Sequence, residues 1–203
     1  MRLSARLACT DFPCEDVDHG RHEIAGRAID PGRVRMIVVA EAPAPDAADG
    51  LFAPGLPFYL ETTLDAFRAA GLEAGSRREL EARGIYLTTA IKCAKVGYGV
   101  GRPTVEACSR LLEKEIDLFP DARAIMLMGD VAIGAFNAIA RRRSGKRLVP
   151  SGPTWRLRGG EYWFEGKRVF PSYLQTGRSY LIERSKREMV AADLRAGLAV
   201  VAG

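Results

Sequence analysis

Long hydrophobic runs are scarce in this sequence of 203 residues. The longest, such as residues 36–40 and 198–202, are far too short to span a bilayer, and the amino-terminus lacks a signal-peptide apolar region. We therefore expect a cytoplasmic protein with no membrane partner. A P-loop is also missing, as is a GxGxxG motif after the first apolar run, which argues against a flavodoxin-like or nucleotide-binding α/β protein.

Histidine and cysteine are rare as well. The chain has only two histidines, His19 and His22, so no imidazole is available after residue 22. It has four cysteines. In a reducing compartment so few cysteines argue against a disulfide framework, and they leave metal binding or independent buried thiols as the choices.

Basic residues exceed acidic ones. Thirty Lys and Arg against 25 Asp and Glu give a formal charge of +5, with clusters at 141–143 and 146–147. Such clusters can neutralise phosphates and release counterions when a protein binds nucleic acid. Charge alone favours the alternative of a solvated helix end, where positive charge suits the helix dipole.

Short apolar runs alternate with helical patterns along the whole chain. The four β-like runs are residues 34–40, 85–91, 124–128 and 168–174. The helical patterns begin near Tyr59, Thr104, Asp130 and Ser185. This alternation predicts an α/β protein. Because no repeat or shift in composition marks a boundary, we expect a single domain over residues 1–203.

Three local patterns give more detailed predictions. Residues 154–170 alternate aromatic and polar side chains around a glycine pair at 159–160, which predicts a hairpin that turns at those glycines. The basic segment 142–152 carries Gly and Pro and is predicted to be a loop. Ser185 and Glu188 have the spacing of a capping box, which predicts that the last helix opens there.

The cysteines lie in segments that could meet. Residues 85–91 read as a buried parallel strand, so Cys93 follows its carboxyl end, where open α/β sheets carry their sites. Cys108 lies on the apolar face of a helical pattern, and Cys9 and Cys14 lie in a loop-like amino-terminal segment. Four thiolates from these segments could share an iron–sulfur cluster or, less in keeping with their wide spacing, a zinc ion. The alternative is four separate buried thiols.

Several short motifs follow one another in a characteristic order. They are AEAPA at 40–44, GLPF at 55–58, TAIKC at 89–93, Cys108, and MG at 128–129. Taken together with the earlier cysteines, these motifs resemble the uracil-DNA glycosylase superfamily, most closely its iron–sulfur family-4 branch. The resemblance runs from Cys9 to about Leu194. It implies a three-layer α/β/α fold around a central, mostly parallel four-stranded sheet.

The resemblance also implies a cofactor and a partner. The four cysteines Cys9, Cys14, Cys93 and Cys108 would hold a structural 4Fe-4S cluster, although Cys9 and Cys14 are further apart than the family's amino-terminal pair. The partner would be DNA containing a damaged or deaminated base. We expect the protein to act as a monomer.

The same resemblance implies site residues for cleaving an N-glycosidic bond. Glu41 would stabilise the positive charge that develops on the sugar and orient water, with Asp46 as a second candidate. The flipped base would be bound by Ala40, Pro57, Phe58 and Thr89. Without the resemblance, Phe58 reads as an ordinary core residue and Glu41 as a helix-capping or surface carboxylate.

Two positions depart from the family pattern. Thr89 stands where the family has the asparagine that reads uracil, so hypoxanthine or xanthine are alternative ligands. The family's His-Pro-Ser motif aligns best with residues 177–179 and has no histidine here, which predicts Gln175, Arg178 and Ser179 as DNA contacts. We therefore expect a DNA glycosylase of base excision repair. The alternative is an iron–sulfur DNA-binding protein on the same fold that has lost catalysis.

Overall fold

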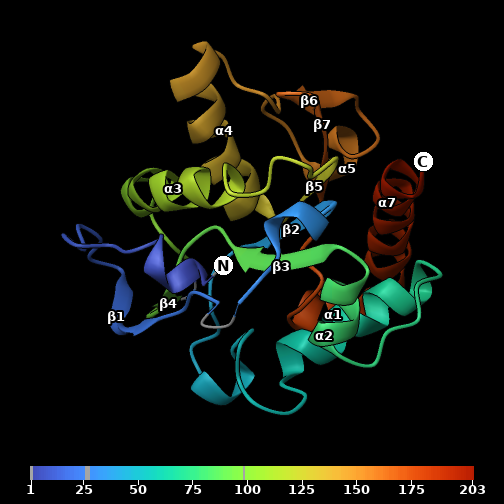
Figure 1. Cartoon of the computed structure of the whole chain (residues 1–203), viewed down its shortest axis with the longest axis horizontal. Helices are drawn as coiled ribbons and strands as arrows, with labels where there is room; N and C mark the ends of the chain where they lie inside the picture. Colours follow the sequence, from blue (N-terminus) through green and yellow to red (C-terminus); the bar gives the residue numbers. More distant parts are fainter. Residues whose placement is uncertain (1, 26–27, 98) are drawn as a thin grey trace.

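A five-stranded sheet forms the centre of the computed structural model (Figure 1). The structure describes residues 2–25, 28–97 and 99–203, except for the side chains of Arg178 and Ser179. The strand order is β3-β2-β5-β7-β6, with bounds β2 Met36–Ala40, β3 Ile85–Thr89, β5 Ala124–Met128, β6 Tyr162–Phe164 and β7 Lys167–Ser172. The first four strands in this order are parallel and β6 is antiparallel. The predicted four-stranded parallel sheet is therefore present, with one additional strand at its edge.

One face of the sheet packs against α3 (Arg102–Ile116) and α4 (Asp130–Ser144). The side chains of Ile37 and Val39 in β2 point into this core, where they meet apolar residues of both helices. Figure 1 shows α3 and α4 together on this side of the sheet. Burial on both faces explains why the central strands read as continuous apolar runs rather than as alternating ones.

The opposite face packs against α1 (Phe58–Ala69) and α7 (Arg184–Ala202). Met36 and Val38 point into this second core, because successive side chains of a strand lie on opposite faces. Figure 1 shows α1 and α7 across the sheet from α3 and α4. The three-layer α/β/α fold predicted from the sequence is confirmed.

Shorter elements complete the described chain. They are β1 Val17–His22, β4 Cys93–Lys95, α2 Arg77–Ala82, α5 Thr154–Leu157, α6 Arg178–Ile182, and three 3-10 turns at Leu3–Ala5, Pro31–Arg33 and Ala47–Asp49. Strands β1 and β4 pair antiparallel as a separate two-stranded sheet. This small sheet joins the amino-terminal segment to the chain that follows β3.

The hairpin turns at a different place from the predicted one. Strands β6 and β7 are joined at Glu165 and Gly166, which both have positive φ, at 48° and 78°. Such a pair is typical of the two-residue turn that matches the twist of a hairpin. The predicted turn at 159–160 was wrong, because the residues before it, 154–157, form helix α5 rather than a strand.

The basic segment 142–152 is only partly a loop. Helix α4 continues to Ser144 and ends at Gly145, whose φ of 74° is left-handed. Arg142 and Arg143 in its last turn both form ion pairs with Glu113 of α3, at 2.7 and 2.6 Å. These arginines therefore join two helices, and the loop begins after them.

The predicted capping box at the start of α7 was wrong. The helix begins at Arg184, with Glu183 at the N-cap, and no side chain caps it. Ser185 consequently lies inside the first turn, where its hydroxyl is not in the position of an N-cap. The carboxylate of Glu188 accepts a hydrogen bond from Arg184 at 2.8 Å.

Within the described ranges, every helix falls short of the length and apolar content that crossing a membrane requires.

Candidate functional site

The carboxyl ends of β2 and β3 bring three predicted site residues together. Ala40 and Thr89 are directly paired across the two strands, and Glu41 follows Ala40. The amides of Ala90 and Ile91 donate to the carbonyl oxygens of Ala40 and Glu41, at 2.7 and 2.9 Å. These bonds hold the segment at the edge where open α/β sheets place their ligands.

The side chain of Glu41 points toward the start of α4. Its carboxylate accepts a hydrogen bond from the backbone N–H of Val131 and lies 3.9 Å from Nζ of Lys95. A Cβ at Gly129 would come within 2.6 Å of Oε1 of Glu41, and Gly129 has a φ of 97°. Only glycine fits there, both in conformation and in space.

The environment of Glu41 changes its acidity. Burial raises the pKa of Glu41, while Lys95 and the N–H of Val131 partly oppose that rise. The position matches the helix-capping alternative, since a carboxylate is stabilised at a helix amino-terminus. It also keeps a carboxylate at the same edge as Thr89.

Phe58 is not a core residue. It is the first residue of α1 and is 36% exposed, and the neighbouring Leu56 is also exposed. Pro57, which precedes it as the N-cap, is buried. Phe58 is therefore accessible from solvent at the amino-terminal end of α1, as a stacking residue requires.

Gln175 is buried rather than exposed. Only 1% of the residue is accessible, and its Nε2 donates to Oη of Tyr59 at 3.0 Å and to Oγ1 of Thr63 at 3.2 Å. These bonds join the loop after β7 to the first turns of α1. Burial raises the pKa of Tyr59 well above its ordinary value, so this hydroxyl stays protonated.

The structure says less about the roles of the other three predicted site residues, Asp46, Arg178 and Ser179. Asp46 is exposed, and its Oδ1 accepts a hydrogen bond from the backbone N–H of Ala48, which caps the turn Ala47–Asp49. Arg178 and Ser179 begin α6, but their side chains lie outside the described part of the chain. Their roles, like those of the other site residues, stay predictions.

A buried ion pair between Lys92 and Glu115 lies at the turn between Thr89 and Cys93. Strand β3 ends at Thr89, earlier than predicted, and Nζ of Lys92 donates to the carbonyl oxygen of Thr89 at 2.5 Å. The same Nζ lies 2.5 Å from Oε2 of Glu115 in α3. Cys93 then opens β4 on the far side of this turn.

All four cysteines line one cavity. Its volume is about 230 Å³, and Cys9, Cys14, Cys93 and Cys108 contribute to its wall. All four are free thiols, with Cys93 and Cys108 buried and the other two half-buried. The sulfur of Cys108 accepts a hydrogen bond from the backbone N–H of Lys92 at 3.2 Å. Segments that are far apart in the sequence thus contribute to one cavity, and their role as cluster ligands stays a prediction.

The cavity favours protonated thiols when it is considered without a ligand. Burial, with the nearby thiols Cys108, Cys14 and Cys9, raises the pKa of Cys93 to about 12, and burial raises that of Cys108 to about 11. A positively charged centre would be needed to stabilise the thiolates. In the part of the chain that the structure describes, no group of three or more His, Cys, Asp or Glu side chains could hold a metal ion.

Sequence reasoning missed the polar residues that support the site. Tyr59 follows Phe58 directly, and Glu115 lies two turns after Cys108 on the same helix. That second spacing puts Glu115 on the cysteine-bearing face of α3. A charged residue on an otherwise apolar helical face was the available signal for a buried partner of Lys92.

Comparisons with known proteins point to one superfamily. The family model of the Uracil DNA glycosylase superfamily matches residues 27–195. A type-5 uracil-DNA glycosylase from Thermus thermophilus is 32% identical over 103 residues, which is 49% of this chain and 46% of that relative. The match thus spans just under half of the relative's length. The finer assignment to the family-4 branch stays a prediction.

Proposed function

Because the chain belongs to the uracil DNA glycosylase superfamily, we propose that it hydrolyses the N-glycosidic bond of uracil or another deaminated base in DNA. One observation supports this most directly. The carboxylate of Glu41 and the buried Thr89 lie at one sheet edge. Glu41 adds to the effect of burial in raising the pKa of Tyr59, which directly follows the exposed Phe58 at the start of α1. We take the protein to act as a cytoplasmic monomer.

Recognition would begin with the flipped base. A base in a stacked duplex cannot be reached by a side chain at this edge, so it must leave the helix. In our proposal it stacks on Phe58 and is enclosed by Pro57 and the backbone of Ala40. The hydroxyl of Thr89 can donate or accept one hydrogen bond at the base edge, which is less selective than an amide.

Hydrolysis would depend on Glu41. The bond from C1′ to the base nitrogen breaks and its electron pair leaves with the base, while the sugar gains positive charge. Water adds to C1′ and loses a proton, which leaves an abasic site and a free base. The carboxylate of Glu41 would stabilise the cationic sugar and orient this water.

The departing base also needs a hydrogen-bond donor. No histidine follows residue 22, and both donors of the Gln175 amide already point at the hydroxyls of Tyr59 and Thr63. We therefore propose Arg178 as the residue that stabilises the negative charge on the base, with Ser179 at the adjoining phosphate. Losing one such donor typically slows a reaction by about a hundred- to a thousandfold.

We propose that the cysteine cavity holds an iron–sulfur cluster, although the described side chains, as they stand, form no group of three or more that could hold a metal ion. Cys9, Cys14, Cys93 and Cys108 line a single space and come from three separate segments, which is the donor set that a 4Fe-4S cluster uses. When bound, the cluster would supply an inorganic cross-link between the amino-terminal segment, β4 and α3. Cys93 and Cys108 would position the turn at Lys92 beside Thr89, because Cys93 follows Lys92 directly and the sulfur of Cys108 accepts a hydrogen bond from the Lys92 N–H.

One observation favours a second candidate function, DNA binding without catalysis. Glu41 already interacts with the N–H of Val131 and with Lys95. In addition, residues 177–179, which align with the family's His-Pro-Ser motif, contain no histidine. A protein with this arrangement could bind DNA through its positive charge and leave the base in place.

A gel assay on oligonucleotides that carry uracil, hypoxanthine or xanthine separates the two functions. We expect alkali-labile abasic sites on at least one substrate, and their loss in Glu41→Gln. Salt-dependent binding with no product on any of the three, by protein with its full iron content, would favour the non-catalytic function instead.

A further inference from the structure

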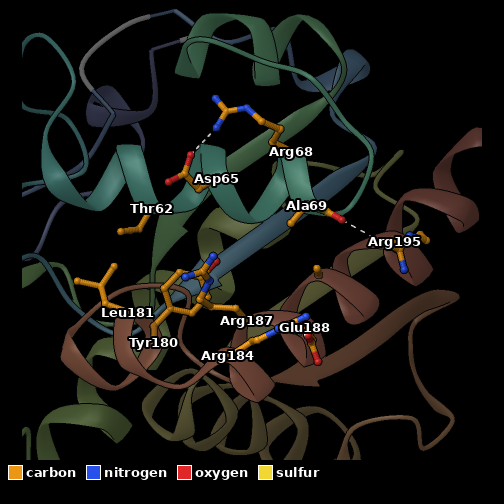
Figure 2. Close-up of a pocket in the computed structure, with 11 residues that line it drawn as sticks. Thr62, Asp65, Arg68, Ala69, Tyr180, Leu181, Arg184, Arg187, Glu188 and Arg195 are labelled. Carbon is orange, nitrogen blue, oxygen red and sulfur yellow. Dashed lines mark hydrogen bonds and ion pairs between the residues drawn. The ribbon is translucent and has the colours of Figure 1, made fainter.

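A groove lies between α1 and the α6–α7 segment, outside the site described above (Figure 2). Its volume is about 730 Å³. The charged residues that line it are Asp65 and Arg68 from α1 and Arg184, Arg187, Glu188 and Arg195 from α7. Four guanidinium groups against two carboxylates make its wall positively charged.

Two of the four arginines are held by carboxylates. Arg68 donates to Oδ1 of Asp65 at 2.5 Å, and Arg184 donates to Oε1 of Glu188 at 2.8 Å. Figure 2 marks the first of these pairs with a dashed line. The excess positive charge of the groove therefore resides on the other two arginines.

Arg187 and Arg195 have hydrogen-bond donors that are available to a ligand. Among the described residues, no hydrogen bond or ion pair involves the side chain of Arg187, which is exposed and extends toward Tyr180 in Figure 2. Arg195 makes one hydrogen bond, to the carbonyl oxygen of Ala69 at 3.0 Å. A guanidinium carries five N–H donors, so both residues can bind an anion.

The groove begins beside the proposed base site. Thr62, at its near end, donates to the carbonyl oxygen of Phe58 at 3.1 Å. Tyr180 and Leu181, also at its wall, directly follow Arg178 and Ser179, and Leu181 is 47% exposed. From there the groove follows α1 and α7 toward Arg195.

We propose that this groove binds the phosphodiester backbone of the DNA strand that leaves the base site, through Arg187 and Arg195. The inference rests on the proposed function for its ligand. Arg187 and Arg195 are separated by about 12 Å along α7, from a rise of about 1.5 Å per residue. One strand of B-form DNA carries a phosphate about every 3.4 Å of helix axis, so guanidinium groups this far apart would contact different phosphates of the strand.

Salt dependence is the direct test, because each neutralised phosphate releases counterions. The affinity for a lesion-free duplex is measured over a range of salt concentrations for the wild type, Arg187→Ala and Arg195→Ala. Each substitution is expected to reduce the slope of log K against log salt by about 0.9, or about 0.7 if the bound strand is single.

Two controls make this result specific. Arg78→Ala removes an exposed arginine from α2, outside the groove, and should leave the slope unchanged. Arg187→Lys keeps the positive charge, so its slope should equal that of the wild type, whereas the slope of Arg187→Ala should be smaller. Unchanged slopes in both groove variants, or an equal reduction in Arg78→Ala, would overturn the proposal.

The outcome also separates this inference from the proposed function. If the groove variants have reduced slopes but the wild type excises no base, the groove proposal is supported and the glycosylase proposal is rejected. Base excision by the wild type, with unchanged slopes in the groove variants, would keep the glycosylase and reject the groove.

Discussion

Nζ of Lys92 lies 2.5 Å from Oε2 of Glu115, and the two side chains are only 1% and 2% exposed. Further hydrogen bonds satisfy the pair: Oη of Tyr86 donates to Oε1 of Glu115 at 2.6 Å, and Nζ of Lys92 donates to Oγ1 of Thr88 at 2.8 Å. The Lys92 side chain also donates to the carbonyl oxygen of Thr89. One buried network thus connects the end of β3 to α3.

Breaking this pair should destabilise the protein strongly. Lys92→Met leaves the carboxylate of Glu115 buried without its cation, which typically costs about 3–5 kcal/mol. The free energy of unfolding is measured by urea denaturation. The double variant Lys92→Met with Glu115→Leu removes both charges and should recover most of the loss. If Lys92→Met alone is as stable as the wild type, the network contributes little to the free energy of unfolding.

Glu41→Gln should slow base excision by about a hundred- to ten-thousandfold, because the amide keeps the size of the side chain but cannot stabilise the cationic sugar. Single-turnover rates on a uracil oligonucleotide measure this effect. Asp121→Asn is a suitable control, since Asp121 is exposed just before β5, at the opposite end of that strand from the site. Equal rates for Glu41→Gln and the wild type would remove Glu41 from the mechanism.

The pH dependence of excision should reflect the raised pKa of Glu41. The ionised carboxylate is the active form, so the rate should fall as pH decreases through this pKa, at a higher pH than for an ordinary glutamate. Lys95 lowers the pKa of Glu41, so Lys95→Met should move the acidic limb to still higher pH. The measurement is the single-turnover rate as a function of pH. A limb that stays in place, or moves down, would contradict this assignment.

Each cysteine of the cavity should be needed for the cluster. Cys93→Ala and Cys14→Ala are expected to lose iron, acid-labile sulfide and visible absorption, because four thiolates are required. His19→Ala, which changes another residue at the cavity wall, should retain all three. Zinc in place of iron in the purified wild type would support the zinc alternative, and full iron content in both cysteine variants would exclude these ligands.

Thr89→Asn should increase the preference for uracil. The two side chains are similar in size, but the amide offers a donor and an acceptor together. One additional hydrogen bond is worth about 1 kcal/mol, or roughly fivefold in the ratio of kcat/KM for uracil to that for hypoxanthine. A ratio that stays the same would show that Thr89 does not face the base.

Much of the sheet could be predicted because its local signals and its tertiary environment agree. Strand β5 lies at the predicted residues 124–128, since an apolar run of that length is stable only when both faces are buried. The hairpin was misplaced because 159–160 and 165–166 are both acceptable turn sequences. Only the pairing of 162–164 with 167–169 decides between them.

The candidate site divides in the same way. Ala40, Glu41 and Thr89 could be grouped from the sequence, because the carboxyl ends of neighbouring parallel strands share one edge. The burial of Gln175 against Tyr59 could not be predicted, since it depends on how the loop after β7 packs on α1.

The order of residues by itself determined the alternation of strands and helices, the strand ends that carry polar groups, and the positions of four sulfur atoms along the chain. Those properties follow from periodicity and burial within short segments. The tertiary structure alone decided that Lys92 meets Glu115, that the four cysteines line one cavity, and that Arg187 and Arg195 line one groove. Each of these depends on distances between segments that are remote in sequence, and such distances are set only when the layers pack.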